Sequence, residues 1–168
     1  TDYMVDKESG PKLIEINTIA VSVLLMASKI KEFHRYSKTF LECEFGIESA
    51  KILEQFKENL PINNFVKNFK IAYDLYLRRT SQKMTNSINS NPKILFLIEK
   101  ENFNMHDIRQ IEYGLNSLGI FCLLRSFDDL SKNDQILKIE EKTGKLFVDH
   151  HEIAIVYYRT GYNPTDYV

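Results

Sequence analysis

The sequence predicts an α/β fold in which an N-terminal strand and helices are followed by a βαβ unit with a mixed sheet and a β-hairpin. Three patterns carry this prediction. Apolar residues recur at helical spacing over residues 19–41 and 65–79. A strand, a helix and a second strand follow one another with short links over residues 93–124. Short apolar segments separated by turn residues fill the remaining third.

The composition is that of an ordinary globular chain. Hydrophobic residues make up 43% of the 168 residues and charged residues 27%, with 22 basic side chains against 23 acidic ones. We therefore expect neither a disordered tail nor a nucleic-acid binder. The longest apolar run, residues 19–27, falls short of the roughly 20 residues of a membrane span, so no membrane contact is expected. Cys43 and Cys122 lack metal-ligand spacing, which favours two buried thiols in a reducing compartment, the cytoplasm.

Residues 1–80 are expected to form a strand and a helical segment. Residues 12–18 are rich in Ile and predict a buried strand. The helical spacing that follows predicts a helix over residues 19–41. A further helix over residues 47–56 should end before Pro61, because the residue before a proline is displaced from the helical conformation.

A third helix is predicted over residues 65–79, where Asn63 or Asn64 can cap the first turn. The Asn- and Ser-rich residues 81–92 then predict an exposed polar loop. We expect this loop to separate the first part of the chain from a βαβ-plus-hairpin part at residues 93–168.

The βαβ unit is predicted from strands at residues 93–98 and 120–124 around a helix at residues 106–118 that ends at Gly119. Its two strands should be parallel.

Antiparallel strands are then predicted at residues 136–139 and 146–148, joined by a turn at residues 142–144. A tight turn at residues 149–151 should lead into a last strand at residues 152–158.

Two oxygen-bearing side chains, Glu15 and Asn17, stand two positions apart on the first predicted strand and therefore share one face. A carboxylate with a carboxamide oxygen suits Mg²⁺, which takes few protein ligands and completes its shell with water and phosphates. The same spacing also fits an edge strand whose polar side chains face water.

Two further features could hold an anion. The backbone N–H groups of residues 20–22 stand at a predicted helix start, with the Ser22 hydroxyl beside them, although Ser22 could equally be a small packing residue. Arg159 ends an apolar strand, where a guanidinium can bind a carboxylate through two hydrogen bonds. Gly161 would allow close backbone approach and Tyr162 a phenol or a ring wall, while a structural role for Arg159 stays open.

Other groups of residues are weaker evidence for a functional site. The cluster at residues 149–152 (DHHE) holds adjacent side chains that point in different directions, so a solvated turn is preferred there to a metal site. No glycine-rich phosphate loop occurs, and any nucleotide clamp would lie outside this chain.

Several blocks in register resemble the eukaryotic type of glutathione synthetase. They are residues 1–4 (TDYM), 14–19 (IEINTI), 107–112 (DIRQIE), 146–152 (LFVDHHE) and 155–164 (IVYYRTGYNP). The resemblance implies the substrate-binding part of an ATP-grasp-type ligase, which joins glycine to γ-glutamylcysteine with ATP and Mg²⁺ through an acyl phosphate. It also implies a homodimer. The chain lacks an initiator Met, so we expect a piece of a longer enzyme whose ATP-grasp domain is absent from this chain and would be its partner in catalysis.

The resemblance assigns roles to particular residues. Glu15 and Asn17 would be magnesium ligands, and Glu15 would also belong to the ATP-binding site. The γ-glutamylcysteine site would be lined by Ile19, Ala20, Val21, Ser22, Asn102, Phe103, Asn104, Arg159, Thr160, Gly161 and Tyr162. None of these is expected to transfer protons, because the chemistry depends on positioning and electrostatics.

Departures from the family pattern leave a second function open. Ala20 stands where a substrate-contacting Ser is usual, Ile108 where a Gln is expected, and residues 23–25 (VLL) where Phe-Gly-Gly is usual. Such losses would fit a noncatalytic peptide-binding or regulatory module derived from the same family. A purely structural α/β interaction domain is a third reading, and it requires Glu15, Asn17 and Arg159 to tolerate alanine.

Overall fold

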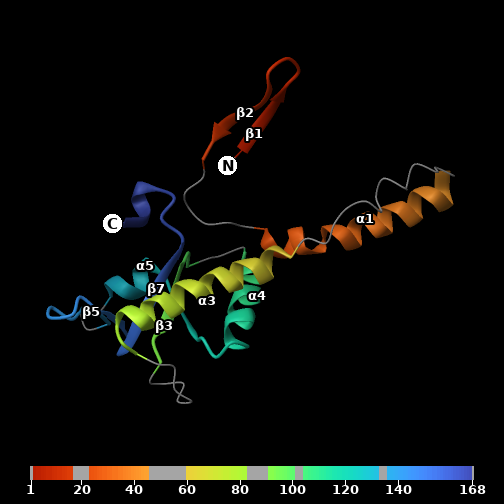
Figure 1. Cartoon of the computed structure of the whole chain (residues 1–168). Coiled ribbons are helices and arrows are strands. Elements are labelled where there is room, and N and C mark those ends of the chain that lie inside the picture. Colours follow the sequence, from red (N-terminus) through yellow and green to blue (C-terminus); the bar gives the residue numbers. More distant parts are fainter. Residues whose placement is uncertain are drawn as a thin grey trace.

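The computed structural model describes residues 2–16, 23–45, 60–82, 91–100, 104–132 and 136–167. Its centre is a five-stranded mixed sheet of strand order β4-β3-β7-β6-β5 (Figure 1). The strands are β3 (Lys93–Ile98), β4 (Cys122–Arg125), β5 (Leu137–Ile139), β6 (Leu146–Val148) and β7 (His151–Arg159). The predicted mixed α/β fold is confirmed.

Strand β3 lies in the middle of the parallel part of the sheet. It pairs in parallel with β4 on one side and with β7 on the other, and helix α4 (Met105–Asn116) connects β3 to β4. The βαβ prediction is therefore correct. A continuous apolar run forms a strand here because both faces of β3 are covered. Ile94 and Phe96 face one core cluster, whereas Leu95 faces the other.

The last three strands form the predicted antiparallel hairpins, β5 with β6 and β6 with β7. Asp149 and His150 link β6 to β7 with φ values of 48° and 67°. Two consecutive left-handed residues match the twist of a tight hairpin. A short helix, α5 (Phe127–Ser131), was not predicted. It begins with a reciprocal capping box between Ser126 and Asp129.

Helix α3 (Pro61–Arg79) packs with α4 over one face of the sheet, where the larger core cluster lies (Figure 1). The predicted cap at Asn63 or Asn64 is wrong. The helix begins at a proline, whose missing N–H needs no partner in the first turn, and no side chain caps it.

The N-terminal strand differs most from its prediction. Strand β2 (Gly10–Glu15) pairs with an unpredicted strand, β1 (Asp2–Asp6), in a hairpin that stands apart from the large sheet (Figure 1). Every β2 residue after Gly10 is exposed, so the prediction of burial for the strand at residues 12–18 is wrong for its described part, residues 12–16. A two-stranded hairpin has no second layer to bury its apolar side chains.

Helix α1 (Leu24–Phe45) begins and ends a few residues later than predicted and extends away from the sheet (Figure 1). Cys43 on α1 is exposed and Cys122 half-buried, which corrects the expectation of two buried thiols. The predicted helix at residues 47–56 and most of the loop at residues 81–92 fall outside the described residues. A short 3₁₀ helix, η2 (Pro164–Tyr167), ends the described chain. Within these ranges, no helix is long and apolar enough to cross a membrane.

Candidate functional site

At the carboxyl end of β7, a positively charged side chain and the residue that follows it are buried. Arg159 is 3% exposed and Thr160 4% exposed, although a charged side chain is seldom so buried. Arg159 pairs in register with Ile98, the last residue of β3. The two central parallel strands therefore end together at this edge, which is where ligands gather in α/β sheets.

The turn after Arg159 is held in one shape. Gly161 has φ 91°, and a Cβ at this position would collide with the Tyr167 side chain. Asp166 Oδ2 accepts the backbone N–H groups of Gly161 and Asn163, each at 3.1 Å. The Tyr167 hydroxyl donates to the Gly161 carbonyl at 3.1 Å. Only glycine fits this conformation, and the space that a Cβ would take is filled by the Tyr167 side chain.

A phenol accompanies the buried guanidinium. Arg159 Nη1 donates a long hydrogen bond, 3.5 Å, to Tyr157 Oη on the same face of β7. Burial raises the pKa of Tyr157, and the hydrogen bond and charge of Arg159 act against that rise. The Tyr157 ring packs against Phe65, Phe69 and Phe96, which fix its position. Tyr162, predicted as a wall, is half exposed at 50%.

Asp107 is a buried carboxylate, 5% exposed, that the prediction of site residues missed. It lies in the first turn of α4, and its Oδ1 accepts the backbone N–H of Leu25 at 2.8 Å. Its charge also contributes to the raised pKa of Tyr157. An acidic residue in the first turn of a predicted helix was the signal in the sequence that could have identified it.

Described residues that flank three predicted parts of the site interact here. Leu25 follows the predicted cradle at residues 19–22 by a few positions, Asp107 follows residues 102–104, and Tyr157 adjoins Arg159. A hydrogen bond joins Leu25 to Asp107, and the charge of Asp107 acts on Tyr157. Asn104 itself stands exposed at the N-cap of α4.

Several predicted site residues lie outside the described residues. They are Asn17, Ile19, Ala20, Val21, Ser22, Asn102 and Phe103. Glu15 is described: it is exposed at the end of β2, opposite Asp2 in register. Across the described ranges, no group of three or more His, Cys, Asp or Glu side chains could hold a metal ion.

The turn at residues 149–152 forms a hairpin tip as predicted, but only His150 is exposed there, and the other three side chains have partners. Asp149 forms an ion pair with Arg125. His151 Nε2 lies 3.2 Å from Lys93 Nζ, and burial lowers the pKa of both groups. These contacts serve the sheet and its loops rather than a metal.

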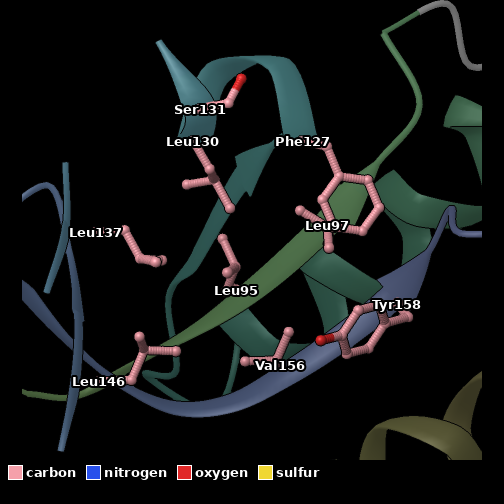
Figure 2. A pocket seen from close by; sticks show the side chains of 9 residues that line it. All are labelled: Leu95, Leu97, Phe127, Leu130, Ser131, Leu137, Leu146, Val156 and Tyr158. Atoms are coloured by element: carbon pink, nitrogen blue, oxygen red, sulfur yellow. The ribbon is translucent and has the colours of Figure 1, made fainter. Parts of the chain in front are cut away.

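A cavity of about 360 Å³ opens on the other face of the sheet, between β3, β7 and α5 (Figure 2). The residues that line it are mainly apolar: Leu95, Leu97, Phe127, Leu130, Ser131, Leu137, Leu146, Val156 and Tyr158. Side chains alternate along β7, so Val156 and Tyr158 face this cavity while Tyr157 and Arg159 face the opposite way. The cavity therefore contains none of the predicted site residues.

Comparisons with known proteins found relatives of the part of the chain that contains this sheet edge. The family described as eukaryotic glutathione synthase matches residues 92–168, which include the whole sheet and the Arg159 turn. Curated glutathione synthetases match over 99% of this chain. That of Macaca fascicularis is 31% identical over 171 residues, and the large chain of Schizosaccharomyces pombe is 28% identical over 182 residues.

The chain is homologous to the eukaryotic glutathione synthetases. It spans 32% of the length of the Macaca glutathione synthetase and 34% of the Schizosaccharomyces one. Among solved structures, a glutathione synthetase like-effector from Globodera pallida in apoform matches with a TM-score of 0.65. That match covers 98% of this chain and 37% of the other at 20% identity, so it supports the glutathione synthetase-like fold alone.

One departure from the glutathione synthetase pattern now has a structural description. Ile108 is 0% exposed and belongs to the same core cluster as Leu24, the first residue of α1. Both side chains serve the packing of α1 and α4 rather than an accessible surface.

Proposed function

We propose that this chain is the γ-glutamylcysteine-binding segment of an ATP-dependent ligase that joins glycine to that dipeptide through an acyl phosphate. The observation that carries the proposal is the burial of Arg159 at the joint carboxyl end of β3 and β7, beside a rigid glycine turn. A guanidinium in this position can bind a carboxylate through two charge-assisted hydrogen bonds.

Burial makes such a bond stronger and more selective than it would be in water. The local dielectric is low around a cation that is 3% exposed, so a carboxylate gains more from pairing there. The Gly161 turn fixes the course of the chain directly after Arg159, and Tyr162 can cover the peptide. In this proposal residues 19–22 and 102–104 complete the peptide site, because their flanking residues converge on Asp107.

Glu15 and Asn17 are proposed to hold magnesium with ATP. A carboxylate and a carboxamide oxygen are the hard donors that Mg²⁺ accepts, and the exposed Glu15 carboxylate is accessible to it. When bound, the ion would neutralise phosphate charge. The ATP site would be completed by the remainder of the enzyme, and we propose that the whole assembles as a homodimer.

The test is phosphate release by the complete protein supplied with ATP, Mg²⁺, γ-glutamylcysteine and glycine. We expect release to require all four. Arg159→Ala should raise the KM for the dipeptide by about thirtyfold or more, as expected for removing one side of a buried charge pair. Glu15→Ala should raise the Mg²⁺ requirement instead.

Two matched controls separate these effects from general damage. Arg109→Ala removes an exposed arginine on α4, and Glu8→Ala an exposed glutamate in the β1–β2 turn. Arg159→Lys keeps the positive charge but loses the two parallel N–H donors of the guanidinium, and it should retain part of the affinity for the dipeptide. An Arg159→Ala protein that turns over like Arg109→Ala would contradict the proposal.

A noncatalytic peptide-binding module is the second candidate. The burial of Ile108 favours it, because the side chain at a position where the family pattern expects Gln packs in the core. The structurally similar Globodera pallida protein is called a glutathione synthetase like-effector. Calorimetry of dipeptide binding without ATP decides between the two: binding without any turnover supports the module, and turnover excludes it.

A further inference from the structure

A lysine and a histidine meet where the central strands begin, at the end of the sheet opposite Arg159. Lys93 is the first residue of β3 and His151 the first residue of β7. Lys93 Nζ lies 3.2 Å from His151 Nε2. Side chains two positions apart on a strand share a face, so both point to the side of the core cluster that contains Leu95 and Ile153.

Lys93 is a buried amine without an acidic partner. It is 9% exposed, although lysine is among the residue types that are least often buried. Across the described residues, no carboxylate lies within ion-pair distance of its ammonium group. Residues 83–90, shortly before this strand in the sequence, contain no Asp or Glu that could pair with it. A buried ammonium group without a counter-charge is unfavourable, so packing alone does not account for a lysine at this position.

The groups around His151 add positive charge. The described charged and titratable groups that act on it are Lys93, Arg125, Asp149 and His150. Asp149 already accepts hydrogen bonds from Arg125, through Nε at 2.8 Å and through Nη2. Burial and the charge of Lys93 lower the pKa of His151, and burial lowers the pKa of Lys93. The Arg125 and Asp149 side chains are 34% and 30% exposed, so this cluster of cationic groups borders solvent.

We propose that Lys93 and His151 form a binding site for a tetrahedral oxyanion, a phosphate group, which goes beyond the proposed function. The anion would accept from the Lys93 ammonium group in place of His151 Nε2, and the imidazole, protonated from solvent, would become a second donor. A phosphate group carries about 1.5 to 2 negative charges at neutral pH, which match an ammonium and an imidazolium. A carboxylate carries one, and would leave one cation without a counter-charge.

Calorimetry of the complete protein tests the site with inorganic phosphate, glycerol phosphate and acetate at constant ionic strength. Mg²⁺ and a non-hydrolysable ATP analogue are present throughout, so that any nucleotide site is occupied. We expect phosphate to bind and acetate to bind more weakly. Lys93→Met should weaken phosphate binding about tenfold or more, as expected for the loss of a hydrogen bond from a charged group. Equal affinity for glycerol phosphate would identify the phosphate group of a larger molecule as the ligand, and a preference for inorganic phosphate would identify the free ion.

Sulfate tests the part of His151, because its charge stays constant over the pH range of the measurement. If the anion favours the protonated imidazole, binding takes up a proton and becomes tighter as the pH falls. The wild type should bind sulfate about fivefold or more tightly at pH 6 than at pH 8, an ordinary size for coupling between two sites. His151→Gln should lose this pH dependence.

Two exposed residues supply matched controls. Lys138→Met on β5 and His106→Gln on α4 should bind both anions as the wild type does. Urea unfolding without anions should show that Lys93→Met is as stable as the wild type, because it removes a buried amine that has no counter-charge. The inference is overturned if Lys93→Met binds phosphate like Lys138→Met, if acetate binds as tightly as phosphate, or if His151→Gln keeps the pH dependence of sulfate binding.

Discussion

The Glu152 carboxylate joins three separate parts of the chain, so its neutralisation should have a large and pH-dependent effect on stability. It accepts the Tyr76 hydroxyl at 2.6 Å, the Gln82 amide at 2.9 Å and the Lys145 ammonium at 3.0 Å. Tyr76 belongs to α3, whereas Glu152 lies on β7. Glu152→Gln keeps the shape of the side chain and removes one acceptor and the charge.

The size of the effect follows from the hydrogen bonds that a glutamine cannot accept. Its amide oxygen, in the place of Oε1, can still accept from Tyr76 and Gln82, but its NH₂ group, in the place of Oε2, then faces the Lys145 ammonium at 3.0 Å and the Gln82 amide at 3.2 Å. A hydrogen bond to a charged group contributes about 1.5–3 kcal/mol in proteins. The Lys145 and Glu152 side chains are 23% and 16% exposed, so water screens the pair in part. We therefore expect Glu152→Gln to lower the free energy of unfolding by about 2–3 kcal/mol.

The pH dependence gives a second check. Burial raises the pKa of Glu152, but the hydrogen bonds from Tyr76, Lys145 and Gln82 together outweigh it, so the pKa lies below the ordinary 4.5. A carboxyl group whose pKa is lowered by folding stabilises the native state above its unfolded pKa. This stabilisation should be complete above pH 4.5 and be lost as the pH falls through the lower, folded value.

Urea unfolding followed by circular dichroism measures both effects, with Glu141→Gln, an exposed glutamate in the β5–β6 turn, as the control. The wild type and Glu152→Gln should differ at neutral pH and converge in acid. A loss below about 0.5 kcal/mol at neutral pH, within the usual range of surface substitutions, would refute the reasoning. So would a difference that stays constant as the carboxyl group becomes protonated.

Three further changes test the packing around the sheet. His150→Gly should raise the free energy of unfolding by about 0.5–1 kcal/mol in thermal or urea unfolding, because glycine adopts the left-handed turn conformation without strain; a loss of stability would show that the imidazole is needed. Gly114→Ala should lower stability by about 1–2 kcal/mol, since its Cβ would lie 2.6 Å from Val66 Cγ2, and the same change in a Val66→Ala background should become neutral or stabilising. Tyr73→Phe should cost about 1 kcal/mol because its buried hydroxyl donates to the Pro92 carbonyl at 2.7 Å, and unfolding by urea that shows no change would mean that water replaces the bond.

Secondary structure was predicted best where the spacing of apolar residues in the sequence matches the burial of those residues in the fold. The apolar run of β3 and the helix ending near Gly119 placed the βαβ unit within a few residues, because a strand covered on both faces reads as a continuous apolar segment. The hairpins β5–β6 and β6–β7 followed from turn residues in the same way.

Burial and long-range contacts were harder to predict. The strand at residues 12–18 was expected to be buried because it is apolar, but apolar composition does not specify what covers a strand, and β2 is exposed. Its place in the first turn of a helix could have drawn attention to Asp107, but no local pattern could show its contact with Leu25, which is distant in sequence. Arg159 was singled out because it ends an apolar strand, but its burial could not be predicted without knowing the order of the strands in the sheet.

The remote cap on α1 also has a consequence for folding kinetics. Leu25 and Asp107 are 82 positions apart, and the entropy lost in closing a long loop has to be met before the contact contributes anything. The first turn of α1 should therefore be completed late, after α4 has formed against the sheet. Asp107→Ala should then accelerate unfolding while leaving refolding almost unchanged. The start of α1 would then form late and open early.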